Sequence, residues 1–101
     1  MRASLLLLVA CSCVTLPHVT PADVERAQSV WPGAELPTLE AARSTYVTRC
    51  SGCHWLYLPT ARAPRQWSVL LPKMALRAKL SANDRDAIER FLMVMSQRPA
   101  N

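Results

Sequence analysis

The sequence lacks several features of large, sheet-based or membrane-spanning proteins. Its 101 residues allow one small domain at most. The apolar run at residues 5–10 is too short for a helix that crosses a bilayer. No period-two alternation typical of strands is present, and no segment repeats. These absences predict a small all-α protein.

One short motif carries most of the chemical information. Residues 50–54 fit C-x-x-C-H, the pattern for covalent attachment of a c-type haem. Thiols three positions apart can reach the two vinyl groups on one edge of a haem, and the adjacent imidazole can bind the iron. We therefore predict one covalently bound haem c, with Cys50 and Cys53 as its thioethers and His54 as the proximal iron ligand.

Two other interpretations of the cysteine pair stay open at this point. C-x-x-C also occurs in thiol–disulfide redox sites and as half of a zinc site. A redox site of that kind expects a βαβ pattern, of which the sequence shows no sign. A zinc site needs a second ligand pair, and the remaining cysteines, Cys11 and Cys13, lie at the end of the N-terminal apolar run.

The N-terminus has the features of an export signal, with a positive start followed by the short apolar run. Residues 8–11 (LVAC) resemble a bacterial lipobox, in which the cysteine becomes the lipidated first residue. We expect residues 1–10 to be a signal peptide and Cys11 to be lipidated, which anchors the protein to a membrane on its periplasmic side. An ordinary signal peptide that leaves a soluble exported protein is the alternative.

Caps and prolines predict where the first two helices begin and end. Thr20, followed by Pro21 and Asp23, predicts the N-cap of a short helix that ends before Trp31. Thr38 is the predicted N-cap of a second helix, which leads into the cysteine motif. The spacing of three and four predicts a shared helical face for four residues of this segment, namely Leu39, Ala42, Tyr46 and Cys50.

Two further helices are predicted after the motif. The third runs from about residue 64 to residue 71 and ends or kinks at Pro72, which places Met74 at a turn. The last begins at Ser81 and carries an apolar stripe. That stripe consists of Ile88, Phe91, Leu92 and Met95.

Residues 38–96 resemble a small monohaem cytochrome c domain of class I. The shared features are an aromatic-bearing amphipathic helix before C-x-x-C-H, a proline-containing loop, a methionine and a closing helix. The resemblance implies a bundle of three to four helices around one haem, over residues 37–101. Residues 11–36 would then form a tether and a short N-terminal helix. In such domains the first and last helices cross beside the haem, which would place Ala42 and Tyr46 against the apolar stripe of the last helix.

The resemblance implies one-electron transfer to or from a redox partner, without enzymatic activity. It implies Met74 as the distal iron ligand, and it places Tyr46, Trp67 and Leu71 in the haem pocket. His18 is the other candidate for the distal position. An open distal site would instead make the protein a haem-based sensor or small-ligand binder. A third possibility is an accessory haem subunit of a larger oxidoreductase complex, docked through residues 20–36. An exposed Trp31 would support this possibility.

The charge is unevenly distributed along the chain. The formal net charge is +5. Residues 43–79 contain no acidic side chain, which predicts a redox partner with an acidic docking surface and also favours anionic lipid headgroups. Alternatively, these cations pair with haem propionates or are simply solvated. A nucleic-acid partner is not expected for an exported chain without a recognition motif. The basic residues of this region are Arg43, Arg49, Arg62, Arg65, Lys73, Arg77 and Lys79.

Overall fold

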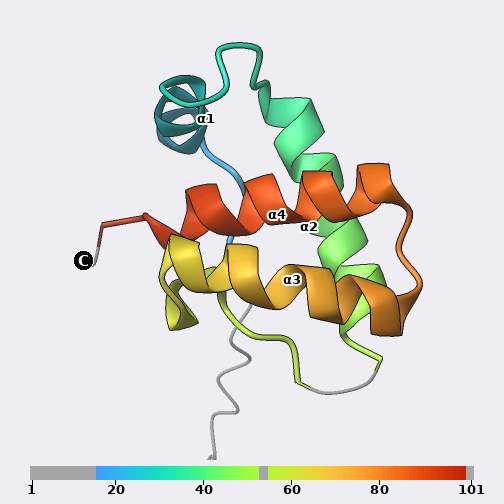
Figure 1. The fold of residues 1–101 in the computed structure, drawn as a ribbon. Coiled ribbons are helices and arrows are strands. Elements are labelled where there is room, and N and C mark those ends of the chain that lie inside the picture. The colour runs from blue at the N-terminus through green and yellow to red at the C-terminus, as the bar shows by residue number, and fades with distance from the viewer. Residues whose placement is uncertain (1–15, 53–54, 100–101) are drawn as a thin grey trace, which may run out of the picture.

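The computed structural model describes residues 16–52 and 55–99 and shows four α-helices in these ranges (Figure 1). No strand is found in the described part of the chain, so the predicted all-α class is confirmed there. None of these helices is both long and apolar enough to span a bilayer. The elements are α1 (Pro21–Gln28), α2 (Leu36–Cys50), the 3-10 helix η1 (Pro59–Ala61), α3 (Pro64–Ala78) and α4 (Ala82–Ser96).

The capping residues act as predicted at the starts of α1 and α4. The Thr20 hydroxyl accepts a hydrogen bond from the Asp23 amide, and the Asp23 carboxylate accepts one from the Thr20 amide at 2.7 Å. Ser81 accepts a hydrogen bond from the Asp84 amide at 3.1 Å. Each cap satisfies amides that a helix start leaves without a partner.

The start of α2 differs from the prediction. The helix begins at Leu36 with Glu35 as N-cap, so Thr38 is not the cap. Pro37 therefore lies in the first helical turn, where a missing backbone donor costs nothing because the first amides of a helix have no partner within it. The proline fits inside the helix, and the predicted N-cap, three residues later than the observed one, is wrong.

The third helix was predicted to end or kink at Pro72, and the structure shows that it does not end there. Helix α3 continues through Pro72 to Ala78 and stops at Lys79, which adopts a left-handed conformation with φ of 55°. Pro72 removes one backbone hydrogen bond, but its ring is exposed while Leu71 and Ala75 beside it are buried. We attribute the continuity to burial of this inner face, whose gain exceeds the loss of one bond. Met74 therefore lies in a helix and not at a turn.

Helix α4 is the centre of the core. It packs against α1, α2, α3 and η1, and α2 crosses it (Figure 1). The ring centroids of Tyr46 on α2 and Phe91 on α4 lie 6.1 Å apart in a tilted arrangement, which confirms the predicted contact between these helices. The four residues of the predicted apolar stripe are all buried.

Residues 16–19 fall within the predicted tether, yet they pack against the helices. Leu16 and Val19 are buried in the core. The guanidinium of Arg43 on α2 donates to the carbonyls of Leu16 and Pro17, the latter at 3.1 Å. Glu40 accepts a hydrogen bond from the Val19 amide. The described part of this segment is thus held in place from α2.

A buried ion pair joins α1 to the segment after α4. The Asp23 side chain is fully buried and contacts Arg26 and Arg98, the latter at 2.6 Å. Burial alone raises the pKa of this carboxyl. Hydrogen bonds from Arg98, from the Thr20 amide and from Arg26 outweigh that effect and hold the pKa well below its usual range. The Asp23 carboxylate is therefore ionised and fixes the two ends of the described chain to each other.

Candidate functional site

A cavity of about 300 Å³ opens between the C-terminal end of α2, the loop before η1 and the C-terminal half of α3. Ligand pockets in proteins typically have volumes of about 300–1,000 Å³. The lining includes two sulfur-containing side chains and three arginines, and none of its members is acidic. The lining residues are Arg49, Cys50, Tyr57, Arg62, Met74, Arg77 and Ala78.

The two sulfur-containing residues reach this cavity from different helices. Cys50 is the last residue of α2 and is half-buried. Met74 is half-buried on α3, and Arg77 and Ala78 share its helical face because they follow it by three and four positions. The first motif cysteine and the predicted distal methionine are thus brought to one cavity, although Met74 reaches it from a helix.

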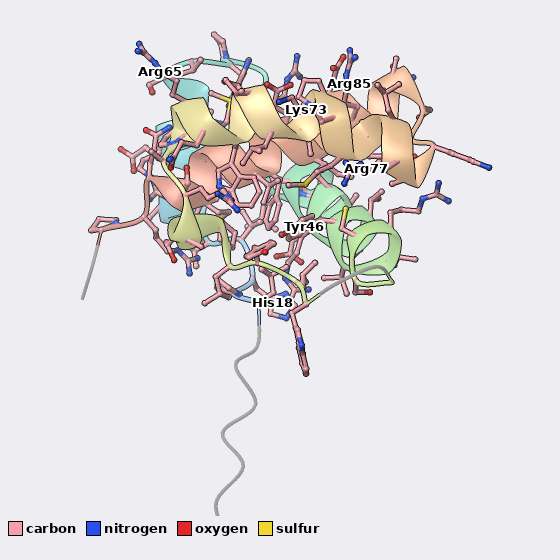
Figure 2. All side chains as sticks on the ribbon, turned by 60° about the horizontal axis from the view of Figure 1, so that its bottom comes forward. His18, Tyr46, Arg65, Lys73, Arg77 and Arg85 are labelled. Atoms are coloured by element: carbon pink, nitrogen blue, oxygen red, sulfur yellow. The ribbon has the colours of Figure 1, made fainter. Side chains whose placement is uncertain are left out.

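Arg49 joins the ends of α2 and α3 at the edge of the cavity. Its guanidinium donates to the carbonyls of Ala78 at 2.8 Å and Lys79 at 3.4 Å. The last carbonyls of a helix have no amide partner within it, so this side chain serves as a C-terminal cap. Figure 2 shows Arg77 on the side of α3 that faces the end of α2.

Arg62 carries a donor that lacks a partner. Its guanidinium carbon lies 5.2 Å from the ring centroid of Tyr57 and 5.9 Å from that of Trp67, so the cation rests against two aromatic faces. Its Nε is buried and has no hydrogen-bond partner among the described residues. A buried donor without an acceptor is costly. Arg62 also lines the cavity, so an anionic group there would meet its positive charge.

The three predicted pocket residues Tyr46, Trp67 and Leu71 lie in the core and are not among the residues that line the cavity. Two of them hold its loop. The Tyr46 hydroxyl donates to the Tyr57 carbonyl at 2.7 Å, and Trp67 Nε1 donates to the Pro59 carbonyl at 2.8 Å. Burial raises the pKa of Tyr46, so its hydroxyl stays protonated as a donor.

Three of the predicted site residues, Cys11, Cys53 and His54, lie outside the described residues. His18 is described and does not line the cavity. Its Nδ1 lies 3.1 Å from Glu40, which stands ten positions before Cys50 on α2. Ten residues of helix correspond to about 15 Å, so His18 binds near the opposite end of α2 (Figure 2).

Sequence reasoning did not identify the arginines and Tyr57 as parts of one site. The sequence could have indicated Arg77 as a neighbour of Met74, since residues three positions apart on a helix share a face. Arg49 and Arg62 belong to the basic region without acidic residues, but nothing local distinguishes them from its other cations. Among the described residues no three His, Cys, Asp or Glu side chains gather into a metal-binding group. The chain matches no protein-family model, no curated protein and no solved structure.

Proposed function

We propose that the protein is an exported electron carrier with one covalent c-type haem in the cavity between α2 and α3. The observation that carries this proposal is that Cys50, the first cysteine of C-x-x-C-H, and Met74 line the same cavity. When bound, the haem supplies an iron that exchanges single electrons between Fe(II) and Fe(III).

The chain offers a complete set of attachment and ligand groups. In this proposal Cys50 and Cys53 form the thioethers, His54 is the proximal ligand, and the Met74 sulfur is the distal ligand. A thioether ligand favours the reduced iron and so raises the reduction potential. The partial burial of Met74 also fits a ligand that points into a cavity.

The arginines of the cavity match the acidic groups of a haem. Haem carries two propionates, and Arg62 lines the cavity with a positive charge. Arg77 lines the same cavity and carries a second positive charge. Charge-assisted hydrogen bonds of this kind are stronger than neutral ones. Cations beside the iron also disfavour the additional positive charge of its oxidised state, which raises the potential further.

The remaining parts of the proposal concern location and partners. We propose a lipid anchor at Cys11 on the periplasmic side of a membrane, a redox partner with an acidic surface, and no catalytic role. Docking through residues 20–36 gains no support from Trp31, which is half-buried and packs 5.5 Å from the guanidinium of Arg90.

The test is an absorption spectrum of protein matured with a haem-attachment system. Wild type is compared with Met74→Ala and with Met93→Ala, a partly buried methionine on α4 that does not line the cavity. We expect covalent haem in all three proteins. The weak long-wavelength band that sulfur ligation gives to oxidised haem should be present in wild type and in Met93→Ala and lost in Met74→Ala, whose reduced form should bind carbon monoxide.

Two results contradict the proposal at different levels. If wild type lacks the band and its reduced form binds carbon monoxide readily, the distal site is open and the protein is a sensor or small-ligand binder. If no covalent haem forms, the electron-carrier proposal as a whole is wrong and the cysteine pair has another role.

A further inference from the structure

The side of α3 that faces away from the core exposes two large aliphatic side chains. Val69 is 59% exposed and Leu76 is 82% exposed. They are seven positions apart, so they lie on one face of the helix, two turns from each other. Trp67, Leu71 and Ala75 are buried on the inner face. Helix α3 therefore has a buried apolar inner face and, on its outer face, two aliphatic side chains that remain largely exposed.

Cations border this apolar strip. Arg65 and Lys73 stand four positions before and after Val69, which places them on the same side of the helix. Figure 2 shows both on the outer side of α3. The helix contains no acidic residue, and Arg77 continues the row of cations to the edge of the cavity. We call Arg65, Val69, Lys73, Leu76 and Arg77 the α3 face.

An apolar hollow adjoins the α3 face beside Leu76. Pro72, Ala75, Leu76 and Leu80 form its apolar wall, and the start of α4 closes it with Ser81, Ala82 and Arg85. Arg85 lies 3.3 Å from Asp86, so its charge is partly compensated. A concave apolar site of this kind accepts a protruding side chain, as the central pocket of a protein interface does.

We propose that the α3 face is a docking surface for a protein partner that presents an apolar side chain surrounded by carboxylates. The proposal rests on the proposed function in taking an acidic protein as the partner, and it adds the surface that binds it. Carboxylates would pair with Arg65 and Lys73, while the apolar side chain would enter the hollow beside Leu76. Because Arg77 also lines the cavity, the partner would dock at its edge.

A protein partner fits this surface better than a membrane does. Helices that lie in a lipid interface bury a broad apolar face with Trp, Phe or Leu. The α3 face has two aliphatic side chains and no aromatic one. Figure 2 also shows Arg65 and Lys73 on the side of the molecule opposite His18. His18 is close to residue 16, where the described part of the chain begins.

The experiment uses the full exported chain and a synthetic acidic peptide with leucines every three or four positions among glutamates. Binding is followed by amide NMR shifts of the labelled protein. We expect the largest shifts in α3, and about a tenfold or greater loss of affinity in Leu76→Ser and in Lys73→Glu, as for residues central to an interface. The matched control Val30→Ser, at a valine that is 63% exposed elsewhere, should bind like wild type.

Two outcomes overturn this inference. Equal affinities in wild type, Leu76→Ser and Val30→Ser show that the peptide does not use the α3 face. Flotation of a Cys11→Ser protein with phosphatidylglycerol vesicles, lost in Leu76→Ser, shows that the face binds lipid. Covalent haem is read separately from the absorption spectrum, so failure of the docking surface and failure of the haem proposal are distinguishable.

Discussion

The Asp23 carboxylate links the two ends of the described chain through its ion pairs with Arg26 and Arg98. Its folded-state pKa lies below the unfolded value, which is about 3.9 for aspartate. The ionised form therefore stabilises the fold above that value, and the stabilisation is lost as the pH falls toward the folded pKa. We expect the free energy of unfolding to be level above about pH 5 and to decline below about pH 4.

Asp23→Asn should remove most of this acid dependence and lower the free energy of unfolding at pH 7 by about 3 kcal/mol, because it leaves two partly buried guanidinium groups without their anion. A smaller decline should remain, since hydrogen bonding to Val19 also lowers the pKa of Glu40. Urea unfolding at several pH values measures both effects. The control is Asp86→Asn, at a surface pair worth about 0–1 kcal/mol. Identical curves for the two variants would contradict the role given to Asp23.

Single residues were predictable where the sequence carries a motif. Cys50 stood out through C-x-x-C-H and lines the cavity. Met74 also lines it, although it lies within a helix and not at the turn that was predicted after Pro72. Arg62 was not predictable as a site residue, because its buried Nε arises from packing against Tyr57 and Trp67. No spacing along the chain encodes that arrangement. The likeness to a cytochrome c domain stays a prediction, since two of its motif residues, Cys53 and His54, lie outside the described part.

At the scale of the elements, a substitution of Pro72 can show how α3 is stabilised. Proline in a helix interior is about 3 kcal/mol less favourable than alanine. The Pro72 ring is exposed, so replacing it removes no core packing. We expect Pro72→Ala to raise the free energy of unfolding by up to about 3 kcal/mol, by restoring the hydrogen bond to the Ser68 carbonyl.

The matched control is Pro64→Ala at the first position of the same helix, where proline costs no hydrogen bond. It should change the free energy of unfolding by less than about 1 kcal/mol. Urea titration of both variants gives the comparison. If Pro72→Ala proves less stable than wild type, the proline is a required part of α3 and the explanation by inner-face burial is wrong.

Helix starts were predictable where a side chain caps the backbone locally, as at Thr20 and Ser81. They were not predictable where burial decides. The two wrong boundaries have different causes. Pro37 lies in the first turn of α2, where a proline costs no hydrogen bond. Pro72 does cost one, and that cost is visible in the sequence. The gain from burying Trp67 and Leu71 becomes visible only when α4 lies against α3.

At the scale of the whole molecule, the segment before α1 belongs to the core. Leu16 is buried and held by Arg43 from α2. Leu16→Ala should lower the free energy of unfolding by about 2–5 kcal/mol, the range for a buried leucine. Leu76→Ala, at an 82% exposed leucine, should change it by less than about 0.5 kcal/mol. Thermal or urea unfolding of the two variants measures the difference. Equal losses in Leu16→Ala and Leu76→Ala would show that residues 16–19 are not part of the stable unit.

This packing could not be predicted from the sequence. Leu16 and Val19 show no helical or strand period, and the groups that hold the segment come from distant positions. Glu40 and Arg43 lie on α2, and Arg98 follows α4. Two apolar residues on either side of Pro17 and His18 have the composition of a linker until those partners are known.

The central place of α4 also governs when the protein can fold. Every other helical element of the described chain packs against α4, which the ribosome makes after all of them. Until α4 is available, α1, α2 and α3 have no common surface on which to bury their apolar sides. A chain built in this order cannot close its core before α4 has been made. This order would suit the proposed export and the proposed attachment of a haem to the cysteines, because both would act on a chain whose core is still open.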